Sequence, residues 1–194
     1  MPRIIAGELK GRPIPGAVGK TTRPTSDRVR EAIFSRLDGW DAIRGARVLD
    51  LFAGTGALGI EALSRGADRA TLVEAHAASA RQLQRSVREL GIGSRTEVRA
   101  AKAESIVREL APGSYDLVFL DPPYDYTTAQ LEQLLAALAP ALSPQALVVV
   151  ERSSRTQVPA WPDGWGDDGT KTYGETVVHF GGPLETSAPS AHLE

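Results

Sequence analysis

The feature that most constrains the fold is a regular alternation of short apolar runs with longer amphipathic runs across residues 47–153. The apolar runs contain few polar side chains, which is typical of strands that are buried on both faces of a parallel sheet. The amphipathic runs between them have the spacing of surface helices. This order predicts an α/β fold with a mostly parallel, doubly wound sheet. The predicted strands cover residues 47–53, 70–75, 96–101, 115–120 and 146–153, and the predicted helices cover 58–66, 77–91, 103–110 and 128–140.

Two further elements flank the alternating region. Upstream, residues 21–37 have a helical pattern in which one side chain of 25–27 can cap the first turn. Downstream, residues 170–182 hold two β-like runs around Gly174, which predicts a hairpin at the edge of the sheet. The apolar side chains of the upstream helix fall at helical spacing and are predicted to be buried: Val29, Ile33, Phe34 and Leu37.

The chain of 194 residues suits one main domain with a small extension. We expect a basic N-terminal extension over residues 1–24, in which residues 3–14 form a small β-hairpin. The doubly wound domain is expected over residues 25–181. Residues 182–194 have the composition of a disordered tail.

The composition excludes several kinds of chemistry. There are no cysteines, which rules out disulfides, thiolate catalysis and cysteine metal sites. His76, His179 and His192 are far apart and lack ligand spacing, so no metal site is predicted. No signal-like start is visible, and prolines interrupt the most apolar stretch, residues 134–150, before it could span a bilayer. We therefore expect a cytoplasmic protein.

The charge is distributed unevenly along the chain. Residues 1–30 hold seven basic and two acidic side chains, whereas the remainder holds 15 basic and 22 acidic ones. A cationic arm on an anionic body fits a protein that binds a phosphate backbone. Charge alone fits a solvated N-terminus equally well. The basic residues of the arm are Arg3, Lys10, Arg12, Lys20, Arg23, Arg28 and Arg30.

A glycine-rich turn follows the first strand, in the segment DLFAGTGALGIEA (residues 50–62). Such a turn lets a ligand approach the backbone just before a helix begins. Gly54, Gly56 and Gly59 match the G-x-G-x-x-G pattern of dinucleotide sites, whereas no Gly-Lys-Ser/Thr follows and a P-loop is excluded. The glycines alone leave two cofactors open, a dinucleotide and S-adenosyl-L-methionine.

Asp50, which ends the first strand, favours one of these two cofactors. A dinucleotide would lay its doubly negative pyrophosphate beside this carboxylate, and the two would repel each other. S-adenosyl-L-methionine has no phosphate but carries an ammonium and a sulfonium, which an acid attracts. Glu74, which ends the second strand, is placed to accept both ribose hydroxyls of either cofactor.

The segment FLDPPYDY (residues 119–126) puts a carboxylate at the end of another buried strand. Ligands of doubly wound sheets bind outside the carboxyl ends of the strands, so Asp121 is expected on the same rim as Asp50 and Glu74. A fixed carboxylate there can orient an exocyclic base amine. It also stabilises the positive charge that grows on the nitrogen during methyl transfer.

The residues after Asp121 suit the same reaction. Pro122 and Pro123 have no N–H and a restricted φ, which holds the nearby carbonyls in place as acceptors. Tyr124 offers a ring on which a splayed-out base can stack, an interaction of ~1–3 kcal/mol per base. The acid and the carbonyls would hold an amine while the ring holds the base.

With these motifs, the chain resembles the Rossmann-like methyltransferases that use S-adenosyl-L-methionine and modify exocyclic amines. It is more closely similar to the RsmD family of bacterial 16S ribosomal RNA guanine-N2 methyltransferases. The D-P-P-Y motif is shared by amine methyltransferases of DNA, RNA and protein, whereas the N-terminal segments narrow the choice to this family. The resemblance covers roughly residues 1–181 and is carried by RIIAGELKGR, TTRPTSDRVREAIFSRL, LDLFAGTGALGIEALSRGA, FLDPPYDY and TYGET.

This resemblance implies one antiparallel strand near the sheet edge and a 16S rRNA substrate within a small ribosomal subunit or an assembly intermediate. The residues implied in catalysis are Asp121, Pro122 and Tyr124. Those implied in cofactor binding are Arg23, Thr25, Asp50, Phe52, Gly54, Gly56, Glu74 and Ala103. Those implied in RNA binding are Arg3, Lys10, Arg12 and Lys20. The chain departs from the family at Lys102, which replaces the acid of an Asp-Ala pair that meets adenine.

Two other function classes fit parts of the sequence. A DNA amine methyltransferase would share the D-P-P-Y motif, but such enzymes usually need a sizeable recognition module, and only a hairpin and a tail follow the core here. A non-catalytic RNA-binding module could keep a cofactor fold, although binding alone would not require Asp121. The choice of guanine N2 over adenine N6 rests on the family resemblance.

Overall fold

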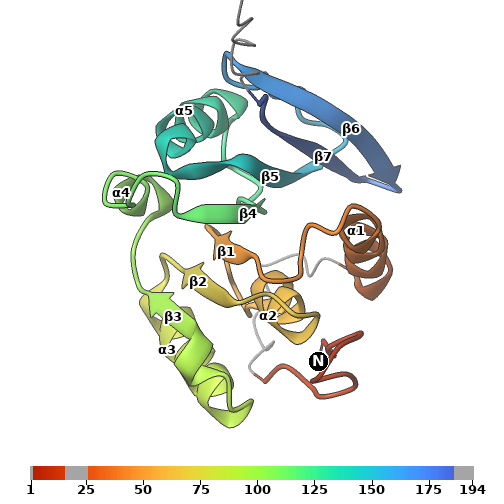
Figure 1. The fold of residues 1–194 in the computed structure, drawn as a ribbon, viewed down its shortest axis with the longest axis vertical. Helices are drawn as coiled ribbons and strands as arrows, with labels where there is room; N and C mark the ends of the chain where they lie inside the picture. Colours follow the sequence, from red (N-terminus) through yellow and green to blue (C-terminus); the bar gives the residue numbers. More distant parts are fainter. Residues whose placement is uncertain (1, 16–25, 186–194) are drawn as a thin grey trace, which may run out of the picture.

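The computed structural model describes residues 2–15 and 26–185, which form a seven-stranded sheet with helices on both faces (Figure 1). The strand order is β3-β2-β1-β4-β5-β7-β6. Strands β1 to β5 pair in parallel, and β7 runs antiparallel to both of its neighbours. The expected doubly wound α/β fold is therefore confirmed. The strands are β1 (Arg47–Asp50), β2 (Arg69–Val73), β3 (Thr96–Arg99), β4 (Tyr115–Leu120), β5 (Leu142–Ser153), β6 (Trp165–Tyr173) and β7 (Thr176–Pro183).

Most of the helices begin and end close to the positions that the sequence pattern predicts, whereas the helix expected over residues 103–110 ends at Ile106. Ser26 caps the first helix, where its hydroxyl accepts the N–H of Val29 at 3.3 Å. The apolar side chains expected on its inner face, from Val29 to Leu37, are all buried. The helices are α1 (Asp27–Gly39), α2 (Ala57–Ser64), α3 (Ala77–Glu89), α4 (Ala103–Ile106) and α5 (Thr128–Leu138), with short 3-10 turns η1 (Gly93–Arg95) and η2 (Ala139–Ala141).

Strand residues alternate between two apolar layers. Val48 of β1 packs in the layer of α1, α2 and α3, whereas its neighbour Leu49 packs in the layer of α4 and α5. Phe119 and Leu120 of β4 alternate in the same way. Because successive side chains of a strand point to opposite faces, helices on both faces explain why the strand sequences are apolar throughout.

The N-terminal hairpin, residues 2–15, packs on the body of the domain. One antiparallel bridge joins its two arms, between Arg3 and Pro13. Ile4 and Ile14 are buried in the same core layer as α1, α2 and α3, with exposures of 1% and 0%. The described part of the basic arm is therefore an integral part of the folded domain. The domain boundary expected at residue 24 lies outside the described residues.

A buried carboxylate, Glu61 of α2, ties this hairpin to the body. It accepts the backbone N–H groups of Ile5 and Ala6 at 2.9 and 3.1 Å and the Nε of Arg65 at 2.9 Å. Arg30 of α1 is also fully buried, and its Nε lies 3.9 Å from Oε2 of Glu61. Buried charges need such partners. Helical periodicity gave no indication of this polar cluster, because Arg30 and Glu61 are ordinary surface residue types.

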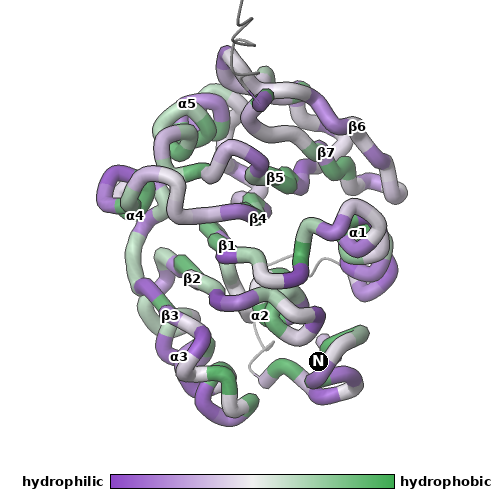
Figure 2. Tube along the Cα trace, viewed as in Figure 1, coloured by the Kyte–Doolittle hydropathy of each residue, from purple (hydrophilic) through white to green (hydrophobic). Residues whose placement is uncertain are grey.

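The C-terminal hairpin expected around Gly174 is confirmed as β7 and β6 at the edge of the sheet. Figure 2 shows hydrophobic colour along β1, β2 and β5 and more polar colour along the edge strand β6. The edge position fits the polar sequence of β6, since one long side of this strand pairs with no other strand in residues 2–15 and 26–185. None of the helices in the described part of the chain is long and apolar enough to cross a membrane.

Candidate active site

Three carboxylates lie at the carboxyl ends of neighbouring strands. Asp50 ends β1 and pairs laterally with Leu72 of β2 on one side and Phe119 of β4 on the other. Glu74 follows β2, and Asp121 follows β4. The strand order reverses at β1, so the three acids surround the switch point at which doubly wound sheets bind ligands.

The turn between β1 and α2 is built for close approach from one side. Gly54 has a φ of +57°, and open space lies where a Cβ would be. Gly56, with a φ of +83°, precedes α2, and a Cβ there would lie 2.6 Å from Leu83 and 2.8 Å from Ile60. A Cβ on Gly59 would lie 2.3 Å from Leu72. Internal packing therefore accounts for Gly56 and Gly59, whereas Gly54 faces open space that a ligand can use.

Asp50 is a buried acid with an unused acceptor. Its residue exposure is 1%, and its Oδ2 accepts the N–H of Gly59 at 3.3 Å. Its Oδ1 has no hydrogen-bond partner within the described residues. Burial is the main reason that the pKa of Asp50 rises from 3.8 to about 7. The N–H groups of Gly59 and Phe52 reduce this rise, whereas the negative charge of Glu74 adds to it. A cationic ligand group at Oδ1 would supply the missing partner.

Glu74 is held by the backbone in a defined orientation. Its Oε2 accepts the N–H of Gly54 at 2.8 Å, and its Oε1 accepts the N–H of His76 at 2.9 Å. The carboxylate is half-buried, and each oxygen retains a lone pair. The two N–H groups therefore fix the side chain next to the open side of the glycine turn, where it can accept hydroxyl groups of a ligand.

The segment Asp121–Tyr126, called the D-P-P-Y loop below, leaves β4 as a closed turn. The N–H of Tyr126 donates to the carbonyl of Pro123 at 2.9 Å. Asp121 is half-buried and Pro122 is buried, whereas Tyr124 is 80% exposed. An aromatic ring this exposed costs nothing to cover with a flat ligand and is available for stacking.

Tyr126, which the sequence analysis did not single out, joins the D-P-P-Y loop to the cofactor turn. Its ring meets the edge of Phe52 with the centroids 5.2 Å apart, and its hydroxyl donates to Glu104 of α4 at 2.6 Å. Burial and the bond to Glu104 raise the pKa of Tyr126, so the phenol stays protonated. The second tyrosine of the segment DPPYDY was the available signal, and its inward direction could not be read from the sequence.

The start of α4 lies on the same rim. Ala103, the first residue of the helix, is 3% exposed, and Lys102 precedes it without a side-chain cap. The carboxylate of Glu104 accepts the hydroxyl of Tyr126 and so braces the wall formed by the D-P-P-Y loop. In the described part of the chain, no cluster of three or more His, Asp or Glu side chains is arranged to hold a metal.

Known proteins match this chain over most of its length. A family model described as conserved hypothetical protein 95 matches residues 2–182. An Escherichia coli K12 protein named ribosomal RNA small subunit methyltransferase D is 36% identical over 180 residues, 92% of this chain and 88% of that protein. A Haemophilus influenzae protein of the same name is 34% identical over 165 residues, which make up 84% of this chain and 84% of that protein. The chain belongs to the RsmD family.

Two solved structures share the fold of this chain. An Escherichia coli structure, provisionally described as the methyltransferase yhhF, is 35% identical with a TM-score of 0.82, over 94% of this chain and 98% of that one. A hypothetical protein from Thermus thermophilus is 28% identical with a TM-score of 0.79, over 95% and 100%. The family resemblance and the class I methyltransferase fold expected from the sequence are thus confirmed.

Of the basic residues expected to bind RNA in this RsmD member, Arg3 and Arg12 also make contacts within the protein, whereas Lys10 is simply exposed. Arg12 donates to two carbonyls at the C-terminal end of α3, at 3.0 and 3.2 Å, and Arg3 donates to the carbonyl of Gly11 at 2.9 Å. Both are exposed and keep further donors, but each also stabilises the hairpin. Lys10 is exposed at the hairpin surface. Lys20 lies outside the described residues.

Two of the expected cofactor contacts, Arg23 and Thr25, also lie outside the described residues. The other expected contacts converge on the edge formed by β1, β2 and β4 and the start of α4. Phe52 differs in character from the rest, because its ring packs against Tyr126 and forms part of the wall between cofactor turn and D-P-P-Y loop.

Proposed function

We propose that this protein uses S-adenosyl-L-methionine to methylate the exocyclic N2 amine of a guanine in 16S ribosomal RNA. The observation that carries the proposal is the shared edge of Asp50 and Asp121. A buried carboxylate, one oxygen of which has no partner among the described residues, ends the strand next to the one that delivers the D-P-P-Y loop. Relatives at 36% and 34% identity, named as small-subunit rRNA methyltransferases, support the substrate class.

The residues present fit S-adenosyl-L-methionine. When bound, this cofactor supplies an electrophilic methyl group on a sulfonium. Asp50 Oδ1 would accept the ammonium, Glu74 the ribose hydroxyls, and the open side of Gly54 admits the ligand close to the backbone. By family resemblance, Ala103 donates its N–H to the adenine, and Arg23 with Thr25 covers the methionine end.

Asp121 is the proposed catalytic group. Its carboxylate accepts an N–H of the guanine amine and orients the nitrogen lone pair toward the methyl group. As the N–C bond forms, the bond between the methyl carbon and sulfur would break and sulfur would keep that electron pair. The positive charge that grows on nitrogen would be stabilised by the fixed carboxylate, which would then take the released proton. The carbonyl of Pro123 is engaged by Tyr126, which leaves the second acceptor role to the carbonyl of Pro122.

Exposed side chains on the D-P-P-Y loop and the N-terminal hairpin would bind the RNA. Tyr124, 80% exposed, provides the face on which the splayed-out guanine stacks. Arg3, Lys10, Arg12 and, beyond the described residues, Lys20 neutralise phosphates of the flanking RNA. A ribosomal substrate implies a cytoplasmic location and a small ribosomal subunit or its assembly intermediate as partner.

The test is transfer of a labelled methyl group to three substrates in parallel. These are small-subunit particles that lack the modification, naked 16S rRNA and duplex DNA, each followed by nucleoside analysis. We expect N2-methylguanosine from the particles or the naked rRNA, and the better of the two identifies the natural substrate. N6-methyladenine from DNA would instead support a DNA amine methyltransferase, and cofactor binding without transfer to any substrate would support a non-catalytic RNA-binding module.

A further inference from the structure

A buried cation lies behind the D-P-P-Y loop. Arg152 of β5 is 7% exposed, and its Nη2 donates to the carbonyl of Tyr126 at 2.9 Å. β5 pairs with β4 in parallel, with Val150 opposite Leu120, so Arg152 lies two residues beyond the position where the loop leaves the sheet. Its Nε has no hydrogen-bond partner among the described residues. A buried guanidinium with an unused donor destabilises a core, so packing alone does not explain this residue.

The charges around Arg152 connect it to the proposed catalytic acid. Burial lowers the pKa of Arg152, whereas the charge of Asp121 and the phenol of Tyr126 raise it. Asp121 and Arg152 therefore attract each other. Arg152 also affects His179 of β7, the strand that pairs with β5 on its other edge. Burial is the main reason that the pKa of His179 is lowered; the charge of Arg152 lowers it further, whereas the charge of Asp167 raises it. Burial and Arg152 therefore both disfavour the charged form of His179.

The contacts of Tyr126 extend the influence of Arg152 across the rim. The Tyr126 carbonyl accepts from Arg152, its ring meets Phe52, and its hydroxyl donates to Glu104. The D-P-P-Y loop is therefore held at its far end from three directions. At its near end, Asp121 continues directly from β4.

We propose that Arg152 is a positioning residue for methyl transfer, which fixes the end of the D-P-P-Y loop through the Tyr126 carbonyl and balances the Asp121 carboxylate from within the protein. This inference rests on the proposed function, because Asp121 is the catalytic group that Arg152 would position. It predicts that cofactor binding and the rate of methyl transfer respond differently to the loss of Arg152. Asp50 and Glu74 lie on β1 and just after β2, two and three strands away from β5, so loss of Arg152 leaves these two cofactor contacts in place while it displaces the acid.

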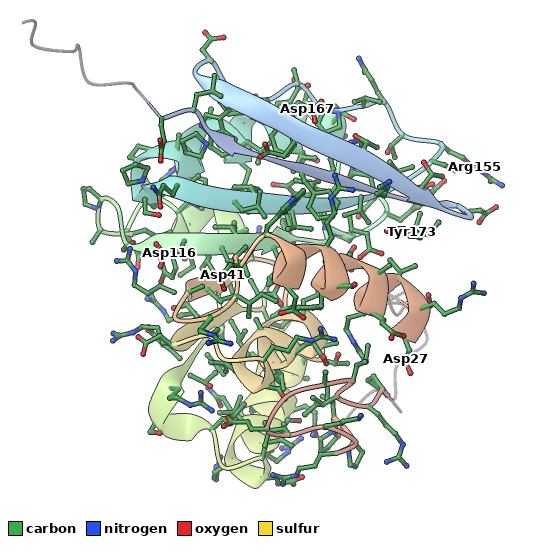
Figure 3. The ribbon with its side chains drawn as sticks, turned by 45° about the vertical axis from the view of Figure 1, so that its right-hand side comes forward. Asp27, Asp41, Asp116, Arg155, Asp167 and Tyr173 are labelled. Carbon is green, nitrogen blue, oxygen red and sulfur yellow. The ribbon has the colours of Figure 1, made fainter. Side chains whose placement is uncertain are left out.

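The experiment compares the variants Arg152→Met and Arg152→Lys with the wild-type protein. Met keeps much of the apolar volume and removes the charge, and Lys restores a charge with a shorter reach. Arg155→Met is the matched control, because Arg155 lies three residues further on, is 73% exposed and pairs with Glu175 near the tip of the β6–β7 hairpin (Figure 3). For each protein, we measure single-turnover methyl transfer, affinity for S-adenosyl-L-methionine by calorimetry, and amide hydrogen exchange at Tyr126.

Arg152→Met is expected to slow methyl transfer at least about tenfold, because small misplacement of a reacting group costs up to about a hundredfold in rate. Its cofactor affinity stays within about threefold of the wild type, since the cofactor contacts lie on other strands. Exchange at the Tyr126 amide, which is bonded to Pro123 at 2.9 Å, becomes faster. Arg152→Lys recovers part of the rate, and Arg155→Met matches the wild type in all three measurements.

Three results would overturn the inference. An Arg152→Met rate within twofold of the wild type would show that the loop needs no cation. Unchanged Tyr126 exchange would show that Arg152 does not hold the loop. Loss of cofactor binding together with transfer, without rescue by Lys, would make Arg152 a core residue with no specific role. If the wild type itself transfers no methyl group, the proposed function fails, and Tyr126 exchange alone then decides whether Arg152 holds the loop.

Discussion

Protonation of Asp50 should control cofactor affinity near neutral pH. The acid is buried, its pKa is raised to about 7, and its Oδ1 has no partner within the described residues. Only the ionised carboxylate attracts an ammonium. The affinity for S-adenosyl-L-methionine should therefore fall as the pH falls through 7, whereas an ordinary aspartate would stay ionised down to about pH 4.

The size of this effect follows from the pKa. With a pKa of about 7, about half of the Asp50 carboxyls are ionised at pH 7 and about a tenth at pH 6. The apparent affinity is proportional to the ionised fraction, so it should fall about fivefold over that unit, which equals about 1 kcal/mol. The α-amino group of the ligand, with a pKa of about 8, stays largely protonated throughout this range.

Titration calorimetry between pH 5.5 and 7 measures the affinity directly, and buffers of different ionisation enthalpy count the protons released on binding. We expect release to approach one proton per ligand at the acidic end. The control is Asp50→Asn, which should bind weakly at every pH and lose the pH dependence. An affinity that stays constant in the wild type, or the same slope in Asp50→Asn, would refute the assignment of the ammonium to Asp50.

The same raised pKa predicts an effect on stability in the absence of ligand. The folded state binds the Asp50 proton more tightly than the unfolded state, so this contribution to stability is complete below pH 3.8 and is lost as the pH rises through about 7. A rise of about three pKa units sets an upper limit of about 4 kcal/mol on the loss. Asp50→Asn removes the buried charge but leaves an amide N–H₂ without an acceptor, which costs about 1–3 kcal/mol. Thermal unfolding at pH 7.5 should therefore show the Asp50→Asn variant to be at least as stable as the wild type, although it binds the cofactor poorly.

Three further predictions test the proposed roles on the rim and on the arm. Asp121→Ala should abolish methyl transfer while calorimetry shows cofactor affinity within a few-fold of the wild type; loss of both would indicate a structural acid. Tyr124→Ala should raise KM for RNA by about 5- to 150-fold, the equivalent of ~1–3 kcal/mol of stacking, with an unchanged melting temperature because the ring is 80% exposed; Tyr124→Phe is the control and should retain most of the affinity. Lys10→Gln should lower the slope of log K against log salt by about 1 in RNA-binding titrations, and an unchanged slope would show that Lys10 contacts no phosphate.

Local patterns in the sequence were sufficient to predict most of the fold. Continuous apolar runs indicated strands buried on both faces, and the helix cap at Ser26 and the turn at Gly174 marked the ends of neighbouring elements. The motif residues Asp50 and Asp121 could be placed on one rim, because parallel strands present their carboxyl ends at the same edge. Each of these inferences uses residues that are close together in the chain or a general rule of sheet topology.

The sequence could not predict the polar contacts between distant segments. Arg30 and Glu61 look like surface residues of two helices, yet they are buried together beneath the N-terminal hairpin. Tyr126 and Arg152 lie 26 residues apart and meet behind the D-P-P-Y loop. Nothing in the local pattern around these residues indicates a buried polar partner.

The amino-acid sequence by itself determined which elements form, which acids stand at the strand ends and to which family the chain belongs. Only the tertiary structure decided the state of those acids. The pKa of Asp50 depends on the desolvation imposed by the packed helix and strands around it, and Asp121 interacts electrostatically with Arg152 of β5, which lies next to β4 in the sheet. Desolvation and charge interactions act through space, so they are defined only when segments distant in sequence are packed together.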